Sequence, residues 1–259
     1  AVQELTGTRN LILFGTKAPV AFFAYPDKPS SLVPEGCIVQ HCAAPEDDCE
    51  DALERLADQL NAPAREPVFA PLKRPALPTG ALSSVSVGAA IGALMPEHAV
   101  VVDEGNTEGI YTFFHTMNAP AHDWLQNMGG SIGMGLPVAV GAAVACPDRK
   151  VICLEGDGSA LYTIQALWTM AREQLDVTTI IFANRSYRIL NIELARVGAG
   201  EARQRAKDML DLSRPNLDFV AMAQSMGVSA SRPKDADEFC RVFEDAMKQR
   251  GPRLIECCI

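Results

Sequence analysis

Short apolar runs alternate along the chain with longer segments in which apolar residues recur every three or four positions. The runs predict strands at residues 10–14, 37–41, 99–103, 150–154, 177–183 and 253–257. The longer segments predict helices at residues 46–60, 139–145, 160–170, 219–226 and 235–250, and a further helix that ends near Leu94. Strands that alternate with helices are typical of a mostly parallel sheet covered by helices on both faces. We therefore predict an α/β fold.

A proline-rich segment divides the chain. Five prolines lie between residues 62 and 80, at positions 63, 67, 71, 75 and 78. Because proline lacks an N–H and fixes its own φ angle, this segment suits neither a long helix nor a central strand, and we predict a linker. Residues 1–61 predict too few elements to close a doubly wound sheet, so we interpret them as the C-terminal part of a central α/β domain. Residues 81–259 predict a complete domain.

The turn that follows the strand at 150–154 carries the clearest candidate chemistry. It reads Glu155-Gly-Asp-Gly-Ser159, and a strand, a glycine turn and a helix in succession point backbone N–H groups and a positive helix end at an anion. Asn184 ends the next apolar run, 27 positions after Asp157. That separation fits one strand–helix–strand unit, so both side chains would emerge at the same carboxyl edge of a parallel sheet. A carboxylate and an amide oxygen beside a phosphate cradle suit Mg²⁺.

These residues resemble the diphosphate–metal motif of the thiamine diphosphate (ThDP) enzymes. In that motif Gly-Asp-Gly is followed, about two dozen residues later, by two asparagines; here Gly156-Asp157-Gly158 is followed by Ala183-Asn184. The second asparagine is the metal ligand in that family. Ala183 replaces only the first, so the ligand position is kept as Asn184. The resemblance implies that Mg²⁺ is held by Asp157, Asn184 and the carbonyl oxygen of Ser186. Gly-Asp-Gly alone also occurs in ordinary turns, and the spacing and strand context distinguish this one.

A second glycine-rich stretch precedes the helix at 139–145. It reads Gly129-Gly-Ser-Ile-Gly-Met-Gly-Leu-Pro137, and its glycines would let the backbone approach a ligand closely. Alone, the stretch would also suit a helix start that packs tightly on a sheet. Together with the metal motif, it resembles the segment that holds the aminopyrimidine ring in ThDP decarboxylases and acetolactate synthases.

The second resemblance implies two catalytic residues, Ile132 and Gly130. The Ile132 side chain would wedge between the two cofactor rings, and its N–H would donate to a ring nitrogen. The Gly130 carbonyl would accept from the exocyclic amine. That geometry would place the amine where it can remove the thiazolium proton, so no external base would be needed.

A third motif, Glu104-Gly-Asn-Thr107, follows the strand predicted at residues 99–103. An ordinary polar turn would have the same composition, but the resemblance implies that this turn contacts the diphosphate. The cofactor-binding residues that the resemblance implies are Asn106, Thr107, Gly130, Ile132, Gly156, Asp157, Gly158, Ser159, Ala160, Tyr162, Asn184, Ser186 and Tyr187.

The resemblance covers residues 80–259 well and is closest to the benzoylformate decarboxylase and acetolactate synthase branches. It implies ThDP- and Mg²⁺-dependent cleavage or ligation next to the carbonyl of a 2-oxo acid, and it leaves decarboxylation and carboligation open. Two departures argue against benzoylformate as the substrate. Ala24 stands where the decarboxylase has a histidine, and Glu193 brings an acidic group to the aromatic side of its pocket. The loop at 15–34 has no obvious flavin signature.

Family members also carry an N-terminal pyrimidine-binding domain, whose glutamate protonates the cofactor ring. Nothing before residue 80 fits that domain, so we expect the glutamate from an N-terminal half or another subunit, in a homodimer or homotetramer. Two alternatives stay open. One is a non-catalytic ThDP-binding subunit. The other is a nucleotide-binding oxidoreductase, although residues 129–135 lack the expected Gly-x-Gly-x-x-Gly directly after a strand.

Composition narrows the remaining possibilities. The chain has 259 residues and a net charge of −9 without a basic block, so no nucleic-acid partner is expected. No apolar run reaches the roughly 18 to 20 residues that span a bilayer, so no membrane role is expected. The eight cysteines form no Cys-x-x-Cys pair. Reduced, buried thiols are typical of cytosolic proteins, so we expect a cytoplasmic location.

Overall fold

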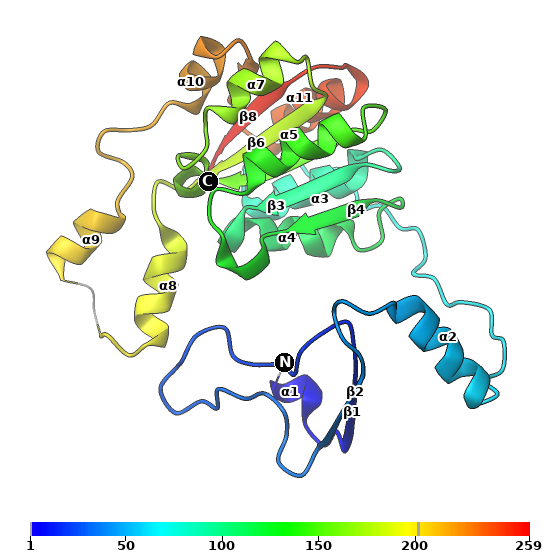
Figure 1. Cartoon of the computed structure of the whole chain (residues 1–259). Helices are drawn as coiled ribbons and strands as arrows, with labels where there is room; N and C mark the ends of the chain where they lie inside the picture. Colours follow the sequence, from blue (N-terminus) through cyan, green and yellow to red (C-terminus); the bar gives the residue numbers. More distant parts are fainter. Residues whose placement is uncertain (1, 201–202) are drawn as a thin grey trace. The chain divides into compact units, whose positions relative to one another are not determined.

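The computed structural model describes residues 2–200 and 203–259, which divide into two compact units (Figure 1). The first unit comprises residues 2–68 and 194–200, and the second comprises residues 69–193 and 203–259. The division after residue 68 falls inside the predicted linker, where residues 62–79 form neither helix nor strand.

The first unit is built on a two-stranded parallel sheet. Its elements are α1 (Val2–Leu5), β1 (Asn10–Phe14), β2 (Ile38–Ala43) and α2 (Cys49–Gln59). The sequence missed α1, because four residues are too few to show a helical period. Between residues 2 and 68, the buried side chains are Leu13 and Ala43 alone. A pair of strands with so little buried area gains little stability from its own core.

The second unit is a six-stranded sheet in which every pairing is parallel, in the order β4-β3-β5-β6-β8-β7. The strands are β3 (Val100–Glu104), β4 (Asp123–Gln126), β5 (Val151–Gly156), β6 (Val177–Ala183), β7 (Ser229–Ser231) and β8 (Arg253–Cys258). The predicted α/β fold with a mostly parallel sheet is confirmed. The sequence missed β4 and β7, which lie at the two edges of the sheet and so need no continuous apolar run.

Helices cover both faces of this sheet (Figure 1). They are α3 (Ser84–Leu94), α4 (Asn106–Thr116), α5 (Gly135–Ala145), α6 (Asp157–Ala160), α7 (Ala166–Arg172), α10 (Phe219–Ser225) and α11 (Ala236–Lys248). Two further helices, α8 (Arg188–Arg196) and α9 (Gln204–Leu210), contain no buried residue and are not part of these layers. In the part of the chain that the structure describes, no helix combines the length and the apolar character needed to cross a bilayer.

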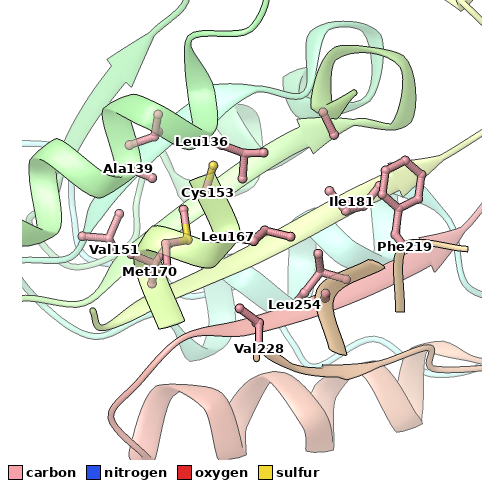
Figure 2. Close-up of a cluster of buried hydrophobic side chains, with 14 of the residues drawn as sticks. Leu136, Ala139, Val151, Cys153, Leu167, Met170, Ile181, Phe219, Val228 and Leu254 are labelled. Carbon is pink, nitrogen blue, oxygen red and sulfur yellow. The ribbon is translucent and has the colours of Figure 1, made fainter. Parts of the chain in front are cut away.

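Two apolar clusters hold the layers together. Figure 2 shows part of the first, in which α5, α7 and α10 pack against the strands. Its labelled members are Leu136, Ala139, Val151, Cys153, Leu167, Met170, Ile181, Phe219, Val228 and Leu254. The second cluster lies on the opposite face, where α3 and α11 supply Val87, Ile91, Phe239 and Phe243. Burial on both faces explains why the central strand β6 is apolar at most of its positions and buried at all of them.

The prediction of a single helix at residues 160–170 was wrong, because the structure has two helices, α6 and α7, with a turn between them. The N–H of Tyr162 donates to the carbonyl of Ser159, three residues back, at 3.0 Å. Thr163 then donates its hydroxyl to the carbonyl of Gly133 at 3.0 Å. Contact with the glycine-rich loop therefore interrupts the helix at a β-branched residue, which has little helix preference of its own.

The strand order places a topological switch point between β3 and β5. The chain leaves β3 toward one edge of the sheet, where it forms β4, and then returns past β3 to form β5 and the remaining strands. The connection after β3 is α4, which packs against α3, whereas the turn after β5 leads into α7 on the other face. Diverging connections of this kind leave a crevice at the carboxyl ends of the two strands, which is where α/β sheets bind ligands.

Candidate active site

A cleft lies at this switch point, formed by the segments that follow β3, β5 and β6. The lining residues are Gly105, Asn106, Thr107, Glu108, Gly156, Asp157, Gly158, Ser159, Asn184, Ser186, Tyr187, Arg188 and Ile189. Nine of the predicted cofactor-binding residues are among them, and they come from three separate segments of the sequence. Since β5 and β6 pair in parallel, their ends bring Asp157 and Asn184 to one edge, as the spacing predicted.

Asp157 supplies a buried carboxylate to the cleft, with a relative exposure of 2%. Its Oδ1 accepts from the N–H of Gly158 at 3.0 Å, and its Oδ2 accepts from the N–H of Arg185 at 2.6 Å. Burial raises the pKa of Asp157 above its ordinary value, while these two N–H groups oppose that shift. A cation bound beside the carboxylate would oppose it further and hold the group charged.

Asn184 and Ser186 lie on the turn after β6. The Asn184 Oδ1 accepts from the Ser186 N–H at 3.0 Å, which folds the turn around the amide. The Ser186 carbonyl accepts from the N–H of Arg188 at 2.8 Å. Asn184 and Ser186 therefore line the same cleft as Asp157, and between them they carry an amide oxygen and a carbonyl oxygen.

These three oxygens fit the metal that the sequence predicted. Carboxylate, amide and carbonyl oxygens are hard donors, and each keeps a free lone pair beside its hydrogen bond. Within residues 2–200 and 203–259, no three His, Cys, Asp or Glu side chains gather as a metal site. A single carboxylate with neutral oxygens suits Mg²⁺, which usually completes its shell with water and ligand phosphates.

The backbone of the cleft restricts which residue fits at two positions. A Cβ added to Gly158 would lie 2.5 Å from the Tyr187 ring, so no larger residue fits there without a shift. Asn106 has a φ of +48°, in the left-handed region, and its Nδ2 donates to the Glu104 carbonyl at 3.1 Å. Asparagine tolerates this conformation better than most residues. Asn106 is the first residue of α4, so the first turn of this helix lies at the edge of the cleft.

Two predicted contacts lie away from this cleft. Ala160 is fully buried in the first apolar cluster, so only its backbone could reach a ligand. Tyr162 has a relative exposure of 60% and packs against Gly133 rather than along the cleft. The roles assigned to these two residues stay predictions that the geometry does not favour.

Gly130 and Ile132 also lie outside the cleft lining, on the loop that precedes α5. The Ile132 N–H donates to the Gly130 carbonyl at 3.0 Å, and Ser131 between them has φ −76° and ψ 80°. These values define an inverse γ-turn. The two groups expected to meet an aminopyrimidine ring are therefore each other's partners here. The turn has to open before the Ile132 N–H can donate to a ring, whereas the Gly130 carbonyl keeps a free lone pair.

A buried glutamate at the end of β3 holds this loop. The Glu104 carboxylate accepts from the N–H of Gly133 at 2.5 Å and from the N–H of Gly135 at 2.6 Å. Glu104 has a relative exposure of 1%. The sequence placed Glu104 only on the phosphate side of the site, because nothing local shows that its acceptors meet a loop 29 positions away.

Glu108 is a lining residue that the sequence missed altogether. It lies in the first turn of α4, a helix that was not predicted, and has a relative exposure of 4%. Its carboxylate accepts from the side chains of Ser84, Asn184 and Arg188. An acidic residue directly after a polar turn offers the one local signal, and that signal is too common to be specific.

This arrangement of a parallel sheet with an oxygen-donor cleft at the switch point is the one expected of a ThDP-binding domain. Residues 103–257 match the family described as the C-terminal TPP binding domain of thiamine pyrophosphate enzymes. The chain belongs to this family, as the motifs indicated, and the nucleotide-binding oxidoreductase is set aside.

The chain is similar over its whole length to a Mycobacterium tuberculosis protein named "Putative acetolactate synthase large subunit IlvX". The two are 52% identical over 260 residues, which is 100% of this chain and 50% of that protein. Benzoylformate decarboxylase of Pseudomonas aeruginosa is 36% identical over 208 residues, 79% of this chain and 38% of the enzyme.

Among solved structures, the ThDP-dependent 4-hydroxybenzoylformate decarboxylase of Rhodococcus jostii RHA1 is similar with a TM-score of 0.77 and 28% identity. The match covers 99% of this chain and 50% of that one. The chain thus spans half or less of the length of these relatives.

Proposed function

We propose that this chain is the C-terminal half of a ThDP- and Mg²⁺-dependent enzyme that cleaves or joins the bond next to the carbonyl of a 2-oxo acid. One observation carries the proposal: the ends of β5 and β6 bring Asp157, Asn184 and Ser186 into one cleft beside two strand-end turns. The relatives named as decarboxylases and acetolactate synthases support this reaction class.

The residues of the chain would hold the cofactor at its charged end. Asp157, Asn184 and the Ser186 carbonyl would bind Mg²⁺, while the turns at 105–107 and 156–159 would orient the diphosphate. ThDP, when bound, supplies the nucleophilic carbon and the electron sink that the reaction needs. The loop held by Glu104 would meet the ring end once the turn between Gly130 and Ile132 opens.

The remaining parts of the site would come from outside these residues. We propose a pyrimidine-binding domain as the partner, from an N-terminal half or another subunit, in a homodimer or homotetramer. The relatives, of which this chain spans half or less, support it. We also propose a cytoplasmic location, supported by eight cysteines that are all free thiols.

Isothermal titration calorimetry tests the cofactor site directly. The chain is titrated with ThDP in the presence and absence of Mg²⁺, and we expect binding that requires the metal. Asp157→Ala removes the one charged ligand and should abolish that binding. Asp148→Ala removes an exposed carboxylate that does not line the cleft and should leave it intact. Equal ThDP affinity in Asp157→Ala and the unaltered chain would contradict the assignment.

A further inference from the structure

Glu108 is a buried carboxylate that accepts from the neighbouring Thr107 hydroxyl at 3.5 Å and from three side chains in other parts of the second unit. Its Oε1 accepts from Nη1 of Arg188 at 2.9 Å and from Nδ2 of Asn184 at 3.3 Å. Its Oε2 accepts from the Ser84 hydroxyl at the start of α3. Since Glu108 lines the cleft, it stands beside the proposed metal ligands without being one of them.

The contact with Asn184 has a direct consequence for metal binding. An asparagine side chain presents an oxygen on one side and an NH₂ group on the other, and only the oxygen can bind a cation. The Ser186 N–H holds the Oδ1 end at 3.0 Å, and Glu108 holds the Nδ2 end. A half-turn of the amide would break both contacts and place the NH₂ group against the Ser186 N–H.

The other partners compensate for the burial of this carboxylate. A buried carboxylate without a partner is strongly destabilising, so it needs a cation and further donors. Arg188 supplies the cation from the rim, where its side chain has a relative exposure of 59%. Ser84 supplies a donor from α3 on the inner side. Glu108 is therefore fixed between α3 and the turn that carries Asn184.

We propose that Glu108 is a positioning residue for the metal centre, which fixes the amide of Asn184 with its oxygen toward the cation. This inference rests on the proposed function, since it assumes that Asn184 is a metal ligand. It assigns to Glu108 a role that acts through Asn184, and to Arg188 the role of neutralising Glu108 at the mouth of the cleft. Partners of this kind around a metal ligand typically change metal affinity by about 10- to 100-fold when they are removed.

A double-mutant cycle with Asn184→Asp tests the orientation. Mg²⁺ is titrated into the full chain at a fixed ThDP concentration. Glu108→Ala should weaken Mg²⁺ binding by about 10- to 100-fold, and Glu108→Gln should weaken it less, because its amide oxygen can still accept from Asn184. An aspartate presents an oxygen in either orientation. In the Asn184→Asp background, Glu108→Ala should therefore cost no affinity, or even increase it by removing a like charge.

The control is Asp176→Ala, which breaks another buried ion pair of the same sheet, with Lys150 at 2.7 Å. It should lower the melting temperature without changing Mg²⁺ affinity. If Glu108→Ala costs the same affinity with and without Asn184→Asp, the proposal is overturned, since Glu108 would then act on Mg²⁺ binding independently of the Asn184 amide.

A metal-free measurement separates this inference from the proposed function. The Asn184 side-chain amide resonance is identified by its disappearance in Asn184→Asp, and its hydrogen exchange is compared between the unaltered chain and Glu108→Gln or Glu108→Ala. Faster exchange in Glu108→Ala supports the contact, and unchanged exchange overturns it. If the amide responds but the unaltered chain binds no Mg²⁺ and ThDP, then the proposed function is wrong, and the metal role of Glu108 is overturned with it.

Discussion

Glu104 on β3 lies directly beside Glu155 on β5, as its register partner in the parallel sheet. Both carboxyl groups are buried, with relative exposures of 1% and 0%. They close around Gly135, where an added Cβ would clash with Oε1 of Glu155 and lie 3.0 Å from Oε2 of Glu104. Burial, followed by the charge of Glu104, raises the pKa of Glu155 well above its ordinary value. Glu155 therefore holds its proton to a higher pH than an ordinary glutamate.

This asymmetry predicts different outcomes for two similar substitutions. Glu155→Gln puts a neutral isostere where burial disfavours the charged form of the acid, and should change the free energy of unfolding by less than about 1 kcal/mol. Glu104→Gln leaves one of the Gly133 and Gly135 N–H groups facing an NH₂ group, which should lower it by about 1 to 3 kcal/mol. Urea unfolding at pH 7, followed by circular dichroism, measures both. A larger loss of stability in Glu155→Gln than in Glu104→Gln would contradict the expectation that burial favours the neutral form of Glu155.

Asp103 predicts a pH dependence of stability. Its Oδ1 accepts from the Gly105 N–H at 2.9 Å, and burial raises the pKa of Asp103 to about 6, against the opposing effect of that hydrogen bond. The folded chain thus holds a proton that the unfolded chain releases near pH 3.8. The corresponding stability is present below that pH and is lost as the pH rises to about 6, by an amount on the order of 3 kcal/mol.

Asp103→Asn should remove this dependence, because the amide cannot ionise and its oxygen can still accept from Gly105. Above pH 6 the variant should be more stable than the unaltered chain, and at pH 4 the difference should shrink. Denaturant unfolding from pH 4 to 8 checks both expectations. Asp148→Asn at an exposed position is the control and should leave the pH profile as it was. An unaltered profile in Asp103→Asn would show that another group titrates.

The fold and the metal cleft were predictable because their signals are local or periodic. The apolar run at 177–183 matches β6 residue for residue, because a central parallel strand is buried on both faces. The spacing from Asp157 to Asn184 predicted their meeting at one sheet edge, because one strand–helix–strand unit returns the chain to the same edge. The cleft geometry bears out that meeting, while the metal-binding roles of both residues stay predictions.

The supporting residues were not predictable, because their burial depends on distant partners. Glu108 meets Ser84 and Arg188, which lie 24 and 80 positions away in the sequence. A carboxylate in the first turn of an unpredicted helix reads as a solvated residue until those partners are known. The closed turn between Gly130 and Ile132 was missed for a different reason: the motif predicts what the loop binds, not its conformation without a ligand.

Ile132 should matter for the reaction and not for the charged end of the cofactor. Its side chain is 39% exposed and does not line the metal cleft. Ile132→Ala should therefore change Mg²⁺-dependent ThDP affinity by no more than a few fold, while lowering the rate of 2-oxo acid consumption in the assembled enzyme. Calorimetry and an initial-rate assay on the same preparation separate the two effects. An unchanged rate would remove Ile132 from the reaction.

Glu256 should couple stability to the metal turn. It is fully buried on β8 and pairs with Arg185 at 3.1 Å and Arg232 at 2.7 Å. The N–H of Arg185 in turn donates to Asp157. Because both arginines are partly exposed, Glu256→Ala should lower the free energy of unfolding by about 2 kcal/mol, less than for a fully buried pair. It should also weaken ThDP binding.

The exposed pair of Arg172 and Glu173 provides the control for Glu256. Glu173→Ala should change the free energy of unfolding by less than about 1 kcal/mol and leave ThDP affinity unaltered. If the two variants lose the same stability, the burial of Glu256 is not the reason for its effect.

The described residues also carry apolar surface that a partner would cover. On α4 the side chains of Ile110, Phe113 and Phe114, and that of Met117 directly after the helix, are 40 to 61% exposed. Exposed apolar residues that gather on one helix commonly mark a contact surface. The relatives are also about twice as long as this chain, which supports a partner that supplies the rest of the site.

We therefore predict that residues 1–259 bind ThDP weakly and turn over no 2-oxo acid alone, because the glutamate that the family uses on the cofactor ring would come from a pyrimidine-binding domain. Mixing the chain with the remaining half of the Mycobacterium tuberculosis relative should restore consumption of a 2-oxo acid and raise ThDP affinity. Phe114→Asp should weaken that complementation, while Val144→Asp at an exposed position of α5 should not. Turnover by the isolated chain as a monomer would refute the requirement for a partner, and equal complementation by both variants would remove α4 from the interface.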